Sequence, residues 1–412
     1  MSQSLSTTCA IVGGGPAGMM TGYLLARAGV DVVVLERHAD FFRDFRGDTI
    51  HPSTMQVMFE LGLLEEFLRV PHQVVKYAEV DLGGERFRVA DFTHLPTRCQ
   101  FIAFMPQWDF LNFLVAKAKG FAGFHLIMEA EARSLVCENG RVDGVRVRTP
   151  TGDFEVRAHL VIGADGRHST LRDDAGFRAR DIGAPMDVLW FRLSHREPEQ
   201  QAVLGRVDAG QALVMLDRRD YWQCALLIAK GTFESVKARG IDAFRTRVAH
   251  LARRDEVSEI RQWDDVKLLS VKVDRLECWH LPGLLFIGDA AHAMSPIGGV
   301  GINLAIQDGV AAVNILTDRL RRREVTVEDL GKVRRRRWLP TCATQAMQVA
   351  IQNKVIYPVL HSERAPAVPR VLKLARRWPV LQRLPARLIG IGVRPEHVRA
   401  SARGDDGRLR SS

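Results

Sequence analysis

Residues 9–20 read Cys-Ala-Ile-Val-Gly-Gly-Gly-Pro-Ala-Gly-Met-Met, and this stretch decides the fold. Its first four residues form a short apolar run that predicts a buried parallel strand. Residues 16–28 follow with apolar side chains at helical spacing, and Gly29 is placed to end that helix. Residues 31–36 predict a second buried strand. Together these elements predict a βαβ unit that opens a doubly wound α/β sheet.

The glycines of this stretch form a G-x-G-x-x-G pattern at Gly13, Gly15 and Gly18. Gly13 permits a tight turn, Gly15 lets the backbone approach a pyrophosphate, and Gly18 lets the helix pack closely on the strand. The helix N-terminus offers free N–H groups and partial positive charge to phosphates. Glu36, at the end of the second strand, can accept hydrogen bonds from a ribose diol. The combination predicts a dinucleotide site.

Two further motifs also follow predicted buried strands. Residues 163–172 read Gly-Ala-Asp-Gly-Arg-His-Ser-Thr-Leu-Arg after a strand over 158–163. Residues 288–305 begin Gly-Asp-Ala-Ala-His after a strand over 284–287, and they continue through a glycine-rich loop into a predicted helix from Gly301. Asp289 can hold a sugar-like hydroxyl, and the later glycines allow main-chain N–H groups to approach a planar ring.

In this order and spacing, the three motifs resemble the class A flavoprotein monooxygenases, the para-hydroxybenzoate hydroxylase-like family. The resemblance covers roughly residues 9–337. It implies FAD as cofactor, NADH or NADPH as a transient reductant, and O2 as co-substrate. It further implies that an aromatic small molecule, phenolic or polycyclic, is hydroxylated through a flavin C4a-hydroperoxide. The protein's own part would be positioning, a dry pocket and help with deprotonation.

The resemblance also assigns roles to individual residues. It places a first group at the FAD pyrophosphate: Gly13, Gly15, Pro16, Ala17, Gly18 and Arg46. Glu36 would bind the adenosine ribose, and Arg37 is a further candidate for binding FAD. Asp165 matches a family motif that is linked to the use of both FAD and NAD(P)H. It places Gln107 near the ribityl chain, Ala132 near the adenine, Gly288 and Asp289 at the ribityl group, and Gly299, Gly301, Ile302 and Asn303 at the flavin ring. Two residues are candidates for a catalytic role: Pro296, which would line the flavin face where oxygen reacts, and His51. His292 is expected to pack within its motif.

The sequence pattern changes in the middle of the chain. Strand-like runs between about residues 183 and 272 predict a separate antiparallel sheet that interrupts the first domain. The expected division is an FAD-binding domain over 1–75, 106–180 and 276–360, a substrate-binding sheet domain over 76–105 and 181–275, a C-terminal helical segment over 361–399, and a disordered tail over 400–412. The candidate substrate contacts in the middle sheet are Trp190, Met215, Trp222 and Cys224.

Composition narrows the class of protein. The chain has 412 residues, a net charge of +10 and six cysteines, none of them in metal-like spacing. No apolar run is long enough to span a membrane, and residues 1–8 lack the pattern of a signal peptide, so a cytoplasmic enzyme is expected. The arginine excess comes without a nucleic-acid motif and is interpreted as solvated helix faces. We expect no metal, no nucleic acid and no integral membrane segment, and the C-terminal helices could support a homodimer.

Two other functions remain open at this point. A flavin oxidoreductase that acts on a prenyl or polyketide-type substrate without oxygen insertion shares parts of this scaffold. A non-catalytic FAD-binding protein would retain the cofactor but show no substrate-stimulated NAD(P)H oxidation. Substrate-dependent oxygen incorporation separates both from a hydroxylase.

Overall fold

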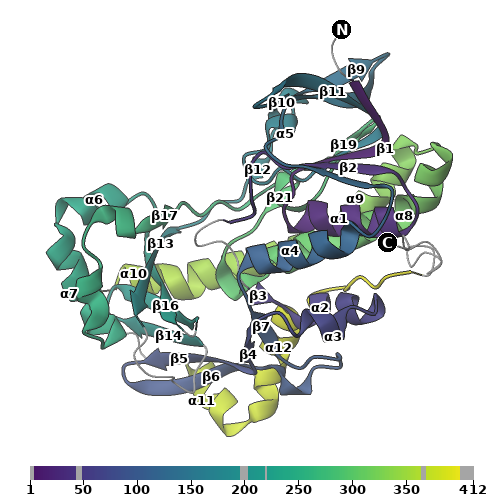
Figure 1. Cartoon of the computed structure of the whole chain (residues 1–412). Coiled ribbons are helices and arrows are strands. Elements are labelled where there is room, and N and C mark those ends of the chain that lie inside the picture. The colour runs from purple at the N-terminus through teal and green to yellow at the C-terminus, as the bar shows by residue number, and fades with distance from the viewer. Residues whose placement is uncertain (1–3, 43–48, 195–202, 219, 363–367, 400–412) are drawn as a thin grey trace.

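The computed structural model describes residues 4–42, 49–194, 203–218, 220–362 and 368–399. Arg46 and the predicted tail over residues 400–412 lie outside the described residues. The fold is a mixed α/β arrangement in which two large sheets are joined by long helices (Figure 1). This agrees with the predicted fold class.

The first sheet has eight strands. Six of them lie side by side in the order β19-β20-β11-β1-β2-β8, and the other two, β10 and β9, extend the sheet from β11. The parallel strands are β1 (Ser4–Val12), β2 (Val32–Leu35), β8 (Phe124–Ile127), β11 (Gly152–Gly163) and β20 (Leu284–Phe286), and β19 (His280–Leu281) pairs antiparallel at the edge. Helix α1 (Pro16–Arg27) connects β1 to β2 and so completes the predicted βαβ unit.

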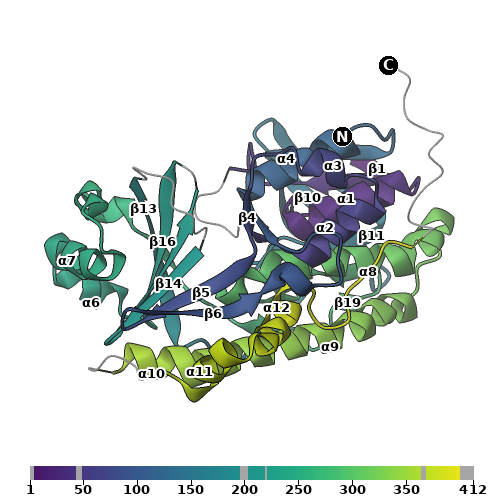
Figure 2. The same cartoon turned by 90° about the horizontal axis from the view of Figure 1, so that it is seen from below.

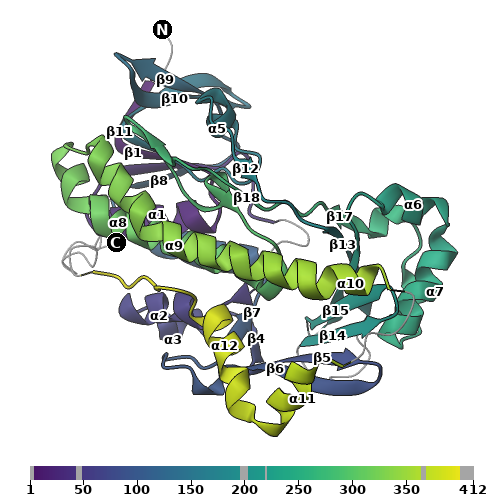
Figure 3. The same ribbon diagram turned by 180° about the vertical axis from the view of Figure 1, so that it is seen from behind.

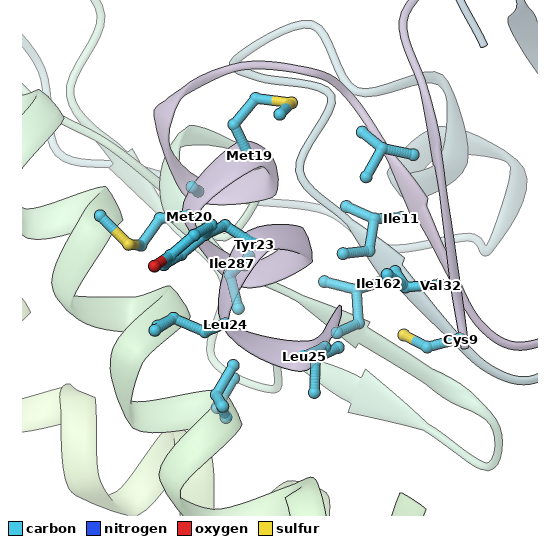
Figure 4. Close-up of a cluster of buried hydrophobic side chains, with 14 of the residues drawn as sticks. Cys9, Ile11, Met19, Met20, Tyr23, Leu24, Leu25, Val32, Ile162 and Ile287 are labelled. Carbon is cyan, nitrogen blue, oxygen red and sulfur yellow. The ribbon is translucent and has the colours of Figure 1, made fainter. Parts of the chain in front are cut away.

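The core of this half forms where α1 packs on the sheet. Met19, Leu24 and Leu25 of α1 are at most 1% exposed, beside Ile11 and Ile162 of the strands (Figure 4). Each such fully buried aliphatic side chain contributes about 1.5–3 kcal/mol relative to exposure, which fixes the helix on the sheet.

A hairpin extends the first sheet through β9 (Glu131–Glu138) and β10 (Arg141–Thr149). Its turn residues Asn139 and Gly140 both have positive φ, at 50° and 75°. Asn and Gly are the residues that best tolerate this left-handed pair in a tight hairpin turn.

The second sheet has seven strands in the order β17-β13-β16-β15-β14-β5-β6. The strands are β5 (Tyr77–Leu82), β6 (Glu85–Asp91), β13 (Met186–Ser194), β14 (Val203–Asp208), β15 (Gln211–Asp217), β16 (Tyr221–Ala229) and β17 (Lys267–Leu269). One pair departs from the antiparallel prediction, because β14 pairs parallel with β5. These two strands come from separate chain segments, so no hairpin fixes their relative direction. Helices α6 (Phe233–Ala238) and α7 (Ile241–Ala252) lie against this half.

Smaller elements lie around and between the two large sheets. Strands β3 (Thr49–Ile50), β7 (Ile102–Phe104) and β4 (Gln73–Val75) form one small sheet, and β12 (Arg180–Asp181), β18 (Asp274–Arg275) and β21 (His292–Ala293) form another. The remaining helices of this region are α2 (Pro52–Glu60), α3 (Leu64–Phe67), α4 (Gln107–Ala118) and α5 (Thr170–Asp174). Short 3-10 turns cover Phe92–His94, Glu256–Glu259, Trp263–Asp265, Gly288–Ala290 and Ile297–Gly299.

Two long helices follow the third motif, and the second of them reaches from the first half to the second sheet. Helix α8 (Gly301–Arg322) packs on α1, and α9 (Val327–Ile351) continues through a π-helical turn (Gln352–Ile356) into α10 (Tyr357–Leu360) beside the second sheet (Figure 3). The segment Ile297–Arg322 is long and apolar enough by composition to cross a membrane, but 72% of its most apolar window is buried inside the fold. Its apolar face therefore belongs to the core.

A helical segment follows residue 368, as predicted. It consists of α11 (Arg370–Arg377), a 3-10 turn (Pro379–Gln382) and α12 (Arg383–Gly390), and it packs on β6 at the lower surface (Figure 2).

Candidate active site

Four parallel strands of the first sheet end at one edge, and each is followed by a predicted site residue. Gly13 follows β1, Glu36 follows β2, Asp165 lies two residues beyond β11, and Gly288 lies two beyond β20. The strand register aligns these ends, since Val12 pairs with both Leu35 and Gly163, and Gly163 pairs with Phe286. The carboxyl edge of an open parallel sheet is where such folds bind ligands.

The glycines of the first motif have separate functions. A Cβ on Gly13 would lie 2.3 Å from the Ala164 carbonyl oxygen, and one on Gly18 would lie 2.0 Å from the Gly13 carbonyl oxygen. These two glycines are required by close backbone packing. A Cβ on Gly15 would meet nothing within 4 Å, although Gly15 stands directly before α1. The open space at this helix N-terminus fits the pyrophosphate of a dinucleotide.

Glu36 is buried and oriented by the backbone. Its Oε2 accepts a hydrogen bond from the Gly14 N–H at 2.9 Å, and its Oε1 accepts one from the His38 N–H at 3.1 Å. The carboxylate is therefore fixed beside the glycine loop, where the resemblance expects the ribose. Arg37 is exposed, and its Nε donates to His38 Nε2.

Contacts between motifs bring the three sequence stretches together. A Cβ on Gly288 would lie 3.2 Å from the Ala17 Cβ, so the third motif rests on the first. Arg167 of the second motif forms an ion pair with Asp289 of the third, with 3.3 Å between the nitrogen and Oδ2. Asp289 keeps a partly exposed carboxylate that can hold a hydroxyl of the ribityl chain.

Asp165 lies next to the glycine loop, because its Cα would be 2.9 Å from a Cβ on Gly13. Its Oδ2 accepts from the Leu171 N–H at 3.3 Å, whereas Oδ1 is buried without a hydrogen-bond partner among the described residues. Burial raises the pKa of Asp165, against opposing hydrogen bonds from Ser169 and Leu171. An unpaired buried oxygen at this edge fits a donor from a bound cofactor.

Behind the Gly288–His292 loop lies a buried ionic network. Asp308 accepts hydrogen bonds from the Gly288 N–H at 3.1 Å, from His292 Nε2 at 2.6 Å and from Arg337 Nε at 2.8 Å. Arg337 also pairs with Glu396 at 3.3 Å. Burial opposes ionisation of Asp308, but His292 and Arg337 outweigh it and hold its pKa below the ordinary value. His292 thus supports the loop from inside the protein.

The predicted flavin-ring loop is tied to the segment after Arg46. The Asn303 Oδ1 accepts from the His51 N–H and from Thr54 Oγ1, each at 2.8 Å, and its Nδ2 donates to the Thr49 carbonyl at 3.0 Å. Thr49 Oγ1 in turn donates to the Gly299 carbonyl at 2.8 Å. Because the side chain of Asn303 is used within the protein, only its backbone N–H would be available to a flavin.

His51 is fully buried beside this loop. Its Nδ1 donates to the Ile389 carbonyl at 2.7 Å, because a carbonyl oxygen can only accept, and Nε2 has no partner among the described residues. Burial lowers the pKa of His51 to about 4, despite an opposing effect of that hydrogen bond. At neutral pH the ring is therefore neutral and presents Nε2 as a hydrogen-bond acceptor. Such a low pKa disfavours a proton-storing base and favours an orienting acceptor.

The other predicted cofactor contacts lie around the same edge and loop. Gln107 is the first residue of α4, and Ala132 is buried in β9. Pro296 precedes the turn at Ile297–Gly299, and its carbonyl accepts from the Gly299 N–H at 3.0 Å. Gly301 and Ile302 open α8, and Ile302 packs against the first core.

The four candidate substrate residues divide between the two faces of the second sheet. Met215, Trp222 and Cys224 are at most 1% exposed and pack against α7 with Phe244 and Val248. They form a core on the face that α7 covers, whereas the loop residue Ile297 packs on the other face, so we do not retain them as substrate contacts. Trp190 lies on the opposite face, in register with Ala225, which pairs with Val214. Ile297 of the flavin loop packs against this opposite face.

Sequence reasoning missed several supporting residues. Thr49, Arg167, Asp308 and Arg337 were not singled out for the site, because their partners are distant in sequence. Helix α9 adds Gln348, whose Nε2 donates to the Ser295 and Ile297 carbonyls at 2.8 and 2.9 Å. A signal existed for this helix, since Gln345, Gln348 and Gln352 repeat at helical spacing and are all buried.

The fold and this edge together define a dinucleotide-binding flavoprotein, and comparison with known proteins specifies its family. The family model described as FAD binding domain matches residues 6–337. A 6-methylpretetramide 4-monooxygenase of Streptomyces rimosus is 31% identical over 401 residues, which are 96% of this chain and 94% of the relative. A rifampicin monooxygenase of Streptomyces venezuelae is 28% identical over 72% of this chain, which spans 61% of that longer relative.

The chain therefore belongs to the FAD-binding domain family of class A flavoprotein monooxygenases, and it is an FAD-dependent monooxygenase. Solved structures agree on the fold. The p-nitrophenol 4-monooxygenase PnpA of Pseudomonas putida superposes with a TM-score of 0.76 at 18% identity, covering 98% of this chain and 99% of that one. The anhydrotetracycline hydroxylase OxyS of Streptomyces rimosus gives 0.73 at 22% identity, covering 94% and 77%. The reductase and non-catalytic alternatives are not favoured.

Proposed function

We propose that this monooxygenase hydroxylates an apolar, fused-ring aromatic molecule that carries an oxygen substituent, with NADH or NADPH as transient reductant. The observation that carries the proposal is the sheet face opposite α7. There Trp190, Ala225 and Val214 form a row across β13, β16 and β15. Trp190 and Val214 are only partly buried, and both border two apolar clusters. A broad apolar surface of this kind suits a large flat ring system.

The names of the relatives favour the same class of substrate. Two of them are a 6-methylpretetramide 4-monooxygenase and a rifampicin monooxygenase, and neither name is that of a single-ring phenol hydroxylase. Bound FAD supplies the electron transfer and the activation of oxygen. The chain's residues bind the cofactor at the glycine loop, hold its ring through the Gly299–Asn303 backbone, and orient the substrate.

A buried amide lies on this face beside the apolar row. Gln223 is 3% exposed, lies in the row beside that of Trp190, and accepts a hydrogen bond from Arg218 Nε at 3.0 Å through Oε1. Its Nε2 is buried without a partner in the part of the chain that the structure describes. Since a buried amide donor left unpaired costs about 1–3 kcal/mol, we propose that Gln223 donates to the oxygen substituent of the substrate.

The first test is oxygen transfer by the purified, FAD-loaded protein. NADH and NADPH oxidation is measured with a panel that runs from single-ring phenols to fused-ring phenols, and products are analysed by mass spectrometry under ¹⁸O2. We expect fused-ring compounds to stimulate oxidation and to gain one labelled oxygen atom. Preference for single-ring phenols would contradict the proposed substrate class. Stimulation without label in any product would instead favour the reductase alternative.

The Gln223→Leu variant tests the orienting role. We expect KM for the best substrate to rise about tenfold, which corresponds to about 1.4 kcal/mol, with unchanged flavin content. The matched control is Cys224→Ser, whose side chain lies on the other face of the same strand. An unchanged KM in Gln223→Leu, or an equal rise in both variants, would remove the assignment.

A further inference from the structure

The C-terminal helical segment presents large apolar side chains to the outside. Five of them are exposed, from 39% for Leu381 to 65% for Leu384, and the set is Leu374, Trp378, Val380, Leu381 and Leu384. The inward positions hold smaller or polar residues, with Ala375, Gln382 and Ala386 all buried. This reverses the usual pattern of a helix packed on a core, and we call the five exposed residues the C-terminal patch.

The inner side of this segment packs against the rest of the protein, so its large apolar residues face outward while its small ones are buried. Ala386 is fully buried in a cluster with Phe92 and Leu95. Gln382 Nε2 donates to the Ala375 carbonyl at 2.9 Å, which closes the turn between α11 and α12. Both helices contact β6, as Figure 2 shows at the lower surface.

The surroundings of the patch are strongly cationic. Residues 368–395 contain seven arginines and lysines and no aspartate or glutamate. Lys373, Arg376, Arg377, Arg383 and Arg387 are all exposed. One acidic neighbour faces them from β6, where Glu85 pairs with Arg376 at 3.5 Å, and both side chains of this pair are more than half exposed. The excess of positive charge therefore remains.

We propose that the C-terminal patch docks the protein onto an anionic lipid surface. Tryptophan and leucine flanked by arginine and lysine are the residues that enter the headgroup boundary of such a surface, and the cations are attracted to anionic headgroups. A second copy of this chain fits less well, because a two-fold interface at the patch would set these cations against each other. Charge complementarity therefore favours an anionic lipid surface over a second copy of the chain as the occupant of the patch.

The docking surface and the flavin loop share one helix. Near the end of α12, the Ile389 carbonyl accepts the hydrogen bond from His51, and the Ile389 side chain lies 3.7 Å from a Cβ position on Gly298. Leu384, on the same helix, belongs to the patch. The helix that would contact the lipid surface therefore also contacts the loop proposed to hold the flavin. This arrangement suits an enzyme whose substrate partitions into lipid.

The proposal is tested by flotation of the FAD-loaded full chain with vesicles. Vesicles of equal parts phosphatidylglycerol and phosphatidylcholine are compared with pure phosphatidylcholine, at about 50 mM and about 500 mM salt. We expect binding to the anionic vesicles that weakens with salt. Trp378→Ser combined with Leu384→Ser should reduce the partition coefficient at least tenfold. Arg377→Gln combined with Arg383→Gln should reduce it about 25-fold, at about fivefold for each cation.

The matched control is Val327→Ser, which removes an exposed apolar side chain at the start of α9, outside the patch. It should bind vesicles as the unmodified protein does, and flavin content and circular dichroism should be normal in every variant. Absence of binding by the unmodified protein, or equal binding to neutral vesicles, would overturn the proposal. Light scattering tests the alternative that a second copy of the chain covers the patch. If the unmodified protein is a dimer and the Trp378→Ser/Leu384→Ser variant is a monomer, a second copy covers the patch and the lipid proposal is wrong.

Discussion

Replacement of Gly15 by alanine separates ligand binding from folding at the glycine loop. The backbone of Gly15 has φ −73°, which alanine adopts without strain, and its Cβ would meet nothing within 4 Å. Alanine is a poorer helix N-cap than glycine, by up to about 1 kcal/mol. It also restricts the unfolded chain, which stabilises by about 0.4–1 kcal/mol. These effects nearly cancel, so the cofactor-free variant should melt within a few degrees of the unmodified protein.

The same methyl group should interfere with FAD. If the pyrophosphate fills the open space before α1, the added carbon intrudes on it, and overpacking of this size costs about 1–3 kcal/mol. The dissociation constant for FAD should then rise by about 5-fold to 150-fold. The assay is titration of deflavinated protein with FAD by fluorescence quenching, alongside thermal melting followed by circular dichroism.

Gly13→Ala is the contrasting variant. Gly13 has φ +105°, and the added Cβ would lie 2.3 Å from the Ala164 carbonyl oxygen, so this variant should lose stability even without cofactor. Unchanged FAD affinity in a folded Gly15→Ala protein would refute the placement of the pyrophosphate. A large loss of cofactor-free stability in that variant would refute the claim that the space is open.

Two further predictions concern the interior. Asp308→Asn should destabilise the protein by about 3–5 kcal/mol at neutral pH, because it leaves buried Arg337 poorly compensated. Since the folded pKa of Asp308 is depressed, its contribution is present above the unfolded value of about 3.9 and is lost as the pH falls through the folded pKa. Chemical denaturation of both proteins from pH 7 to pH 3 should therefore show a shrinking difference, and a constant difference would contradict this account. Met215→Ala should cost about 2–5 kcal/mol in thermal and chemical denaturation but leave KM unchanged, because Met215 lies in the core against α7. A raised KM with full stability would return Met215 to the substrate site.

The turns and helix starts can be predicted from the sequence, because each of them depends on glycines at particular positions. The turn after β1, the Asn139-Gly140 hairpin and the start of α8 each depend on residues adjacent in the chain. Strand ends can also be placed, and parallel strands bring those ends to one edge. For this reason the amino-acid sequence alone predicts that Glu36, Asp165 and Asp289 belong to one site.

Contacts between residues far apart in the chain could not be predicted in this way. Alternation along β16 shows that Trp222 and Cys224 share a face, but only the folded protein shows that this is the face covered by α7. The parallel pairing of β14 with β5 depends on two segments more than a hundred residues apart. The place of His51 in the chain suggests a candidate for a catalytic role, whereas its burial and its hydrogen bond to Ile389 arise only in the folded protein.

The network at Asp308 shows why the third motif needs more than its own residues. A buried ion pair contributes little net stability, because desolvation of both charges offsets their attraction. Its value lies in geometry: Asp308 binds the Gly288 N–H and His292, so it fixes the loop that carries Asp289. Arg337 extends this support to Glu396, near the end of the described chain. The loop is thus held in position by Asp308 of α8, Arg337 of α9 and a C-terminal segment, and none of these buried groups needs to touch the cofactor.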